Sequence, residues 1–257
     1  MNRRQICRYK ISDFGCSSAV DTTDLKHHYS QQFNAELEDL RTRVLAMGGL
    51  VEQQLSMAIN AVNRRESEAA EKVVLNDQKV NACDVDIDQR CTKILALRQP
   101  AASDLRLVLT VIKMTGDLER IGDECKSVAQ MALRAAQDDK GVNLIRQVSN
   151  LGTQVQQMLH RALDSFARMD VDEAVDIVHE DVNIDREYES VIRQSMTYMM
   201  EDPRSIPGVL DLIWAARALE RIGDRCRNIS QYVIYFVAGR DVRHTSSLDE
   251  IKKEFGE

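Results

Sequence analysis

The sequence predicts an all-α fold built as a tandem repeat of two three-helix bundles, with six long antiparallel helices. The 257 residues include only 11 Gly, 3 Pro and 5% aromatic residues, too few for the turns and strand positions of an all-β fold. Apolar residues recur with helical period over long stretches, and the second half of the chain repeats the first. Composition, periodicity and repetition therefore favour the same architecture.

The internal repeat covers most of the chain. Residues 58–81 align without a gap on residues 162–185, and the phrase LERIGD occurs at 118–123 and again at 219–224. Between these segments the register changes slightly, which surface loops absorb at little cost. We therefore divide the chain into a first repeat, 24–138, and a second repeat, 139–240.

Helical periodicity predicts three helices in each repeat. They span 34–65, 68–98 and 103–136 in the first repeat, and 144–169, 171–200 and 206–238 in the second. Asp170 followed by Glu173 has the spacing of a capping box at the start of the fifth helix, and Pro100 and Pro203 mark turns. Short connections between long helices predict up-and-down bundles.

The two ends of the chain are expected to lie outside the bundles. We expect residues 1–23 to be a disordered extension and residues 241–257 a flexible tail. The first residues are basic but lack the continuous apolar core of a signal peptide. We conjecture that Val20, read from a GTG codon, is the native start.

Composition also limits the class of function. No apolar run approaches the ~20 residues of a membrane-spanning helix, so no membrane insertion is expected. The six cysteines show no CxxC spacing, which favours reduced thiols in a cytoplasmic protein. A net charge of -7 disfavours nucleic acid as a partner. No catalytic triad, phosphate loop or nucleotide fingerprint occurs, so we predict no catalytic residues and no enzyme activity.

Acidic residues recur at equivalent positions of the two repeats. Glu and Asp lie four apart, and so side by side, on the third predicted helix and again on the sixth. The preceding helix of each repeat carries further acids, and we predict that all of them fall on buried stripes, together with Asn81 and Asp88. The candidate site residues are Asp77, Asp84, Glu119 and Asp123 in the first repeat and Asp181, Asp185, Glu220 and Asp224 in the second.

Buried carboxylates need a positive partner, because desolvating like charges costs several kcal/mol per ion, to an order of magnitude. One alternative is ion pairing with arginines on the same helices, namely Arg106, Arg120, Arg217 and Arg221. The other is a metal ion, since carboxylate oxygens suit hard cations. The residues alone leave both alternatives open.

Other repeated residues favour packing over chemistry. Gly122 and Gly223 suggest close helix contact, and Cys125 and Cys226 are expected to be buried as small apolar side chains. In ferritin-like di-iron enzymes a His stands three residues after the Glu, where this chain has the two glycines. This weighs against a carboxylate-bridged metalloenzyme. His160 has no counterpart in the other repeat and is expected to be partly exposed.

The sequence resembles the PhoU family of phosphate-signalling regulators. The resemblance covers about residues 24–240 and rests on the tandem repeat and on four stretches of sequence. These are QFNAELEDLR (32–41), RQPAASDLR (98–106) leading into DLERIGD, TYMMEDPRSIP (197–207) and LERIGDRCRNI (219–229). The match is close to the enterobacterial type.

The resemblance implies pseudo-twofold symmetry between the bundles, and metal ions or clusters (Fe, Zn, Mn or Mg) held by the motif acids Glu119, Asp123, Glu220 and Asp224. It also implies a cytoplasmic, often homodimeric adaptor. Such an adaptor couples the ATPase of the high-affinity phosphate ABC transporter (PstB type) to a sensor histidine kinase (PhoR type), and represses the phosphate regulon when phosphate is plentiful. A metalloenzyme and a metal-free helical scaffold are the alternatives.

The two implied sites differ at one position. Asn81 stands where the second repeat has Asp185. We therefore expect the first site to be weaker, or to rely on Asp77 and Asp84.

Overall fold

The computed structural model describes residues 22–64, 67–135, 142–243 and 248–255. The predictions for residues 1–21, including the conjectured start at Val20, lie outside the described residues. The chain divides into two units, Met1–Ala35 and Glu36–Glu257. Of the first unit, the structure describes only the beginning of helix α1 (Thr22–Arg64), which starts twelve residues before the predicted position 34. The packing described below is that of Glu36–Glu257.

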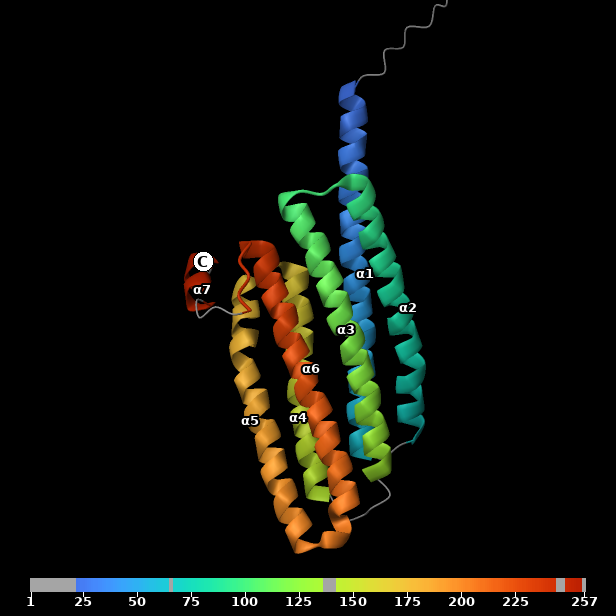
Figure 1. Cartoon of the computed structure of the whole chain (residues 1–257), viewed down its shortest axis with the longest axis vertical. Helices are drawn as coiled ribbons and strands as arrows, with labels where there is room; N and C mark the ends of the chain where they lie inside the picture. The colour runs from blue at the N-terminus through green and yellow to red at the C-terminus, as the bar shows by residue number, and fades with distance from the viewer. Residues whose placement is uncertain (1–21, 65–66, 136–141, 244–247, 256–257) are drawn as a thin grey trace, which may run out of the picture. The chain divides into compact units, whose positions relative to one another are not determined.

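Six long helices form two three-helix bundles (Figure 1). The first bundle contains α1, α2 (Ser67–Arg98) and α3 (Ala102–Ala135), and the second contains α4 (Val142–Arg168), α5 (Val171–Glu201) and α6 (Ile206–Ala238). A short 3-10 turn, η2 (Pro203–Ser205), joins α5 to α6. No strand occurs in the described parts of the chain. The predicted fold class is confirmed.

The two repeats meet along two seams, α3 against α6 and α1 against α4. At the α1–α4 seam, a Cβ added to Gly48 would lie 2.7 Å from a methyl of Leu163, and one added to Gly152 would lie 2.9 Å from Ile59. In the alignment of the repeats, Gly48 corresponds to Gly152 and Ile59 to Leu163. An aliphatic side chain of each helix therefore packs against the equivalent glycine of the other helix, as pseudo-twofold symmetry requires.

The helix ends are formed by residues that favour helix caps and turns. The side chain of Asp170 caps α5 by accepting a hydrogen bond from the Glu173 amide at 3.0 Å. The predicted capping box is only half formed, because the Glu173 carboxylate accepts from Arg161 instead. At the end of α6, Gly239 has φ 71°, a left-handed conformation that glycine adopts without strain.

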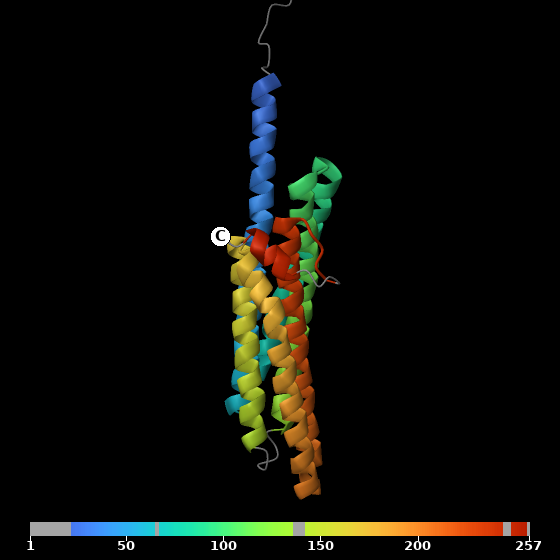
Figure 2. The same cartoon turned by 90° about the vertical axis from the view of Figure 1, so that its left-hand side faces the viewer.

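The C-terminal segment corrects one prediction. Part of the expected flexible tail forms α7 (Leu248–Phe255), which packs on α5 through Ile251 (1% exposed) and an ion pair between Lys252 and Asp176. Figure 2 gives a second view of α5, α6 and α7. None of the described helices is long and apolar enough to span a bilayer.

Candidate functional site

The motif acids of α3 lie at the rim of the first bundle core, whereas Glu220 on α6 is buried at 9% exposure, as predicted, and Asp224 is partly buried. In α3 the buried stripe includes Leu118 and Gly122, and each motif acid follows one of these by a single residue. One residue turns the side chain by about 100° around the helix, so Glu119 is half-buried and Asp123 is exposed. The prediction that all these acids fall on buried stripes is therefore wrong for Asp123.

The same correction applies to the preceding helices. Asp77 and its counterpart Asp181 are buried as predicted, at 4% exposure each. Asn81, Asp88 and Asp185 are exposed, and Asp84 is partly buried. The buried stripe of α2 runs through Val73, Asp77, Val80, Ile87, Cys91 and Ile94. It shares only some positions with the predicted stripe, because two neighbouring seven-residue patterns were possible for this helix.

The first acidic cluster consists of Asp77 on α2 and Glu119 and Asp123 on α3. Lys126, also on α3, holds it together: its Nζ lies 2.7 Å from Asp77 Oδ2 and 2.6 Å from Asp123 Oδ1. Asn81 Nδ2 donates a further hydrogen bond to Asp77 Oδ2 at 3.2 Å. The other oxygen of Asp77, Oδ1, is buried without a hydrogen-bond partner. One ammonium group thus joins carboxylates from two helices.

Burial and the neighbouring carboxylates act on the pKa of Glu119 in the same sense, whereas burial and hydrogen bonding act on the pKa of Lys126 in opposite senses. Burial, followed by the charges of Asp123, Asp84 and Asp77, raises the pKa of Glu119. Burial opposes the charge on Lys126, but its hydrogen bonds to Asp123 and Asp77 outweigh burial and raise the pKa of Lys126. The cluster therefore favours a cation in its centre.

The second acidic cluster consists of Asp181 on α5 and Glu220 and Asp224 on α6, with Asp185 at its edge. Arg227 pairs with Asp181 through Nη1, and its Nη2 lies 2.8 Å from Asp224 Oδ1. Arg217 Nη1 lies 2.8 Å from Glu220 Oε1, while Glu220 Oε2 is buried without a partner. Burial raises the pKa of Glu220, against the lowering effect of Arg217, and nearby carboxylates raise it further.

Three of the four arginines predicted to neutralise the candidate acids interact with other groups. Arg120 pairs with Asp117, Arg221 with Glu124, and Arg106 donates to the carbonyl of Phe236. Only Arg217 contacts a motif acid. The cations that sequence reasoning missed, Lys126 and Arg227, each stand three residues after the motif Asp. That spacing, repeated in both halves, was the signal that could have revealed them.

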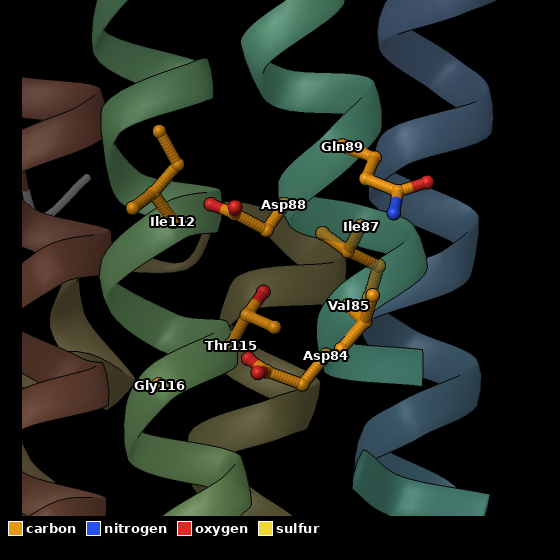
Figure 3. A pocket seen from close by; sticks show the side chains of 8 residues that line it. All are labelled: Asp84, Val85, Ile87, Asp88, Gln89, Ile112, Thr115 and Gly116. Atoms are coloured by element: carbon orange, nitrogen blue, oxygen red, sulfur yellow. The ribbon is translucent and has the colours of Figure 1, made fainter. Parts of the chain in front are cut away.

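A cleft opens beside the first acidic cluster, between α2 and α3 (Figure 3). It has a volume of about 280 Å³. The carboxylates of Asp84 and Asp88 extend from α2 toward the α3 wall, which Ile112, Thr115 and Gly116 form. Burial and the charge of Asp88 raise the pKa of Asp84. The acidic region of the first repeat therefore continues from the first acidic cluster into the cleft, through Asp84 and Asp88.

The repeated glycines and cysteines serve packing. A Cβ on Gly223 would lie 3.0 Å from Ile184, and one on Gly122 would contact Val80 at 3.4 Å. Cys125 and Cys226 are fully buried, and burial raises the pKa of both thiols. Exposed His160 pairs with Glu52 across α1 and α4, as expected of a histidine outside the site. These interpretations are confirmed.

The side chains in their present positions do not form a closed metal site. Among the described residues, no three His, Cys, Asp or Glu side chains are grouped so as to hold a metal ion. The centre of the first acidic cluster is instead taken by the Lys126 ammonium, which lies between two carboxylate oxygens. The donor set is nevertheless all oxygen, as hard cations prefer.

Fold and clusters together define a class of protein: an all-helical tandem repeat with a duplicated carboxylate motif on the third helix of each bundle. A family model described as "PhoU domain" matches residues 44–132 and 148–233, one match per repeat. The chain belongs to the PhoU family.

Relatives and solved structures agree. The phosphate-specific transport system accessory protein PhoU of Serratia marcescens is 52% identical over 88% of this chain and 92% of its own length. The Escherichia coli (strain K12) protein of the same name is 50% identical over 91% and 96%. The crystal structure of PhoU from Pseudomonas aeruginosa matches with a TM-score of 0.77 at 49% identity, covering 81% of this chain and 100% of that one.

A more distant structure shares the fold. The phosphate transport system regulatory protein PhoU from Streptococcus pneumoniae matches with a TM-score of 0.75 at 30% identity. The match covers 82% of this chain and 99% of the Streptococcus pneumoniae chain.

Proposed function

We propose that this protein is a non-enzymatic, cytoplasmic regulator accessory to the phosphate-specific transport system. Membership of the PhoU family over both repeats carries this proposal, together with the names of relatives that are about half identical over nearly the whole chain. In this proposal the protein couples the transporter ATPase to a sensor histidine kinase and represses the phosphate regulon when phosphate is plentiful.

Metal binding at the two acidic clusters is part of the proposal. The residues fit a hard cation in two respects: all donors are carboxylate oxygens, and buried Asp77 and Glu220 each keep one oxygen without a partner. A bound ion would act as a Lewis-acidic cross-link between neighbouring helices. Asp77 and Asp123 would hold it after Lys126 has moved away, because Lys126 now lies between them. Fe, Zn, Mn and Mg are the candidate metals.

Signalling by contact needs an exposed surface suited to other proteins. Ile206, Leu210 and Trp214 recur every four residues along α6, so they share one face. They are 37%, 42% and 56% exposed, and because they share one face they form an apolar patch rather than isolated exposed residues. This face supports the proposed homodimer. If light scattering gave a monomer for the wild type at tens of micromolar, the dimer would be rejected.

The regulatory proposal is tested in cells. Deletion of the gene is expected to switch on a phosphate-regulon reporter in phosphate-rich medium, and the wild-type chain to restore repression. Affinity capture of the tagged chain from phosphate-replete cells is expected to recover both the transporter ATPase and the kinase. Recovery of neither, with an unchanged reporter after deletion, contradicts the proposal.

A metal-free helical scaffold is the second candidate. It is favoured by one observation: Lys126 and Arg227 already pair acids of both clusters. Elemental analysis of protein purified without chelators separates the two candidates. Near-stoichiometric metal supports the first, and its absence together with normal repression supports the scaffold.

A further inference from the structure

The two acidic clusters differ in the number of internal cations that they contain. In the second acidic cluster, Arg217 and Arg227 both pair with its carboxylates. In the first acidic cluster, Lys126 is the only cation among the described residues that does so. The repeats therefore share the motif acids and the buried Asp of the preceding helix, but they differ in the cations that neutralise these groups.

The difference originates at one helical position. In the alignment of the LERIGD phrases, Arg217 of the second repeat corresponds to Gly116 of the first. A Cβ added to Gly116 would meet nothing within 4 Å, because this residue forms a wall of the open cleft. In the second repeat the equivalent space receives Arg217, whose guanidinium lies over the ring of Tyr188 at 5.6 Å. Tyr188 itself corresponds to Asp84.

Replacing Tyr188 and Arg217 by Asp84 and Gly116 leaves the first repeat with excess negative charge. Asp84, Asp88 and Glu119 form no ion pair within the described residues. Asp77 is 4% exposed, and its Oδ1 has no hydrogen-bond partner. An unpaired buried carboxylate oxygen costs free energy unless a ligand satisfies it. In the second acidic cluster Glu220 Oε2 is also unpaired, but Arg217 neutralises that carboxylate through Oε1.

The internal cations also differ in how easily an ion can displace them. Lys126 offers one ammonium on a flexible stem, and ammonium groups are strongly hydrated. Arg227 binds Asp181 and Asp224 with two different nitrogens, a forked arrangement that is harder to replace. The side chain of Lys126 is 26% exposed, so it has solvent to move into.

We propose that the first acidic cluster is the tighter divalent-cation site of this chain, and that Arg217 weakens the second acidic cluster by acting as a built-in counter-ion. This inference rests on the proposed metal binding and deepens it. It reverses the expectation drawn from Asn81. Asn81 in place of Asp185 removes one negative charge from the first repeat, whereas Gly116 in place of Arg217 removes a positive charge and Asp84 in place of Tyr188 adds a negative one.

The test uses the full-length chain stripped with chelator and titrated with Mn²⁺, with free Mn²⁺ followed by electron paramagnetic resonance. Glu119→Gln and Glu220→Gln are compared with the wild type. Glu119→Gln is expected to weaken the tighter binding event by about 10–100-fold, the range known for lost support of a metal site. Glu220→Gln is expected to leave that event unchanged.

Substitutions at the two equivalent positions, Gly116 and Arg217, test the role of Arg217. Arg217→Ala is expected to tighten the weaker event by about tenfold, because one counter-charge disappears. Gly116→Arg is expected to weaken the tighter event, and its Cβ would enter open space at the wall of the cleft. Arg221→Ala is the matched control: it removes an arginine from the same helix, one that pairs with Glu124. Circular dichroism verifies that each variant is folded.

The outcomes separate this inference from the proposed function. No Mn²⁺, Zn²⁺ or Fe²⁺ binding to the wild type rejects metal binding itself. Binding that is lost first in Glu220→Gln, or that is equal at the two clusters and insensitive to Arg217→Ala, rejects the inference and leaves metal binding intact.

Discussion

At the scale of single residues, the electrostatic state of each cluster carboxylate depends on whether a cation faces it. Asp77 faces Lys126, while Glu119, one helix away, has no ion-pair partner in the described part of the chain. Burial and three neighbouring carboxylates raise the pKa of Glu119. A raised carboxyl pKa means that the ionised group opposes folding.

The effect of Glu119 on stability should depend on pH. Because its folded-state pKa lies above the unfolded value of 4.5, the penalty is fully present above the folded pKa and fades as the pH falls toward 4.5. In metal-free protein, Glu119→Gln should therefore raise the free energy of unfolding at pH 7 by about 0.5 kcal/mol, the size of a like-charge pair. The gain should shrink at acidic pH.

Urea unfolding at a series of pH values measures this gain. Exposed Glu71→Gln on α2 is the control and should change stability little at any pH. A Glu119→Gln variant that is less stable than the wild type at pH 7 would show that the carboxylate has a favourable partner.

Lys126 should stabilise the first bundle through the buried carboxylate that it faces. Among the described residues, Lys126→Met leaves Asp77 with only Asn81 as a side-chain donor. We therefore expect a loss of about 1–2 kcal/mol, reduced from the cost of a fully buried pair by the partial exposure of the lysine. A double-mutant cycle with Asp77→Asn measures the coupling. Coupling near zero would mean that solvent screens this pair completely.

At the scale of helices, the close contact of α1 with α4 depends on residues without side chains. Gly48 and Gly152 admit Leu163 and Ile59 so closely that no Cβ fits without a shift. In the sequence, this contact is indicated only by two glycines at equivalent positions of predicted helices. A glycine within a helix can mark either a close packing contact or a position where the helix is merely less stable, and the sequence does not distinguish the two.

Two adjacent glycines of α1 should respond oppositely to alanine. Gly48→Ala would place Cβ 2.7 Å from Leu163, so overpacking of about 1–3 kcal/mol should outweigh the gain in helix propensity. Gly49→Ala meets nothing within 4 Å and should stabilise by about 0.5–1 kcal/mol. Thermal unfolding of both variants tests this. Equal shifts in the same direction would mean that Leu163 moves freely aside.

At the scale of the whole molecule, a buried carboxylate joins the two repeats. Asp117 on α3 is 3% exposed and accepts hydrogen bonds from Tyr232 at 2.9 Å and Arg225 at 3.3 Å, both on α6. Its counterpart in the second repeat is Ala218, so this link is made only once. The interface between the repeats is therefore not fully symmetric.

Asp117→Ala should destabilise both repeats together. Loss of the carboxylate leaves Arg225 and the Tyr232 hydroxyl without that partner, and we expect a cost of about 2 kcal/mol because Arg225 stays partly solvated. The fluorescence of Trp214, the single tryptophan, follows the second repeat, and circular dichroism follows both. Asp176→Ala, which breaks an exposed ion pair, is the control. Separate transitions of the two probes would contradict coupling of the repeats.

Much of the fold was predictable because its signals are local or repeated. Helical period, the turn prolines and the doubled LERIGD phrase located the six helices and their pairing into two bundles. Helix α7 was not predicted, since its burial depends on a contact with α5 that no local pattern contains.

By itself, the sequence determined that two equivalent helical bundles each carry acids on neighbouring helices. It left open which side of a helix faces the core, because adjacent seven-residue patterns both hold apolar residues in α2. Only the tertiary structure decided that Asp123 lies at the rim and that Lys126 and Arg227 pair with the acids of the two clusters, whereas Arg120 pairs with Asp117. It also decided that the space beside Gly116 is open, while Arg217 occupies the equivalent space in the second repeat. The physical reason is that charge pairing acts over a few ångström, and such distances are set by how helices are rotated against one another.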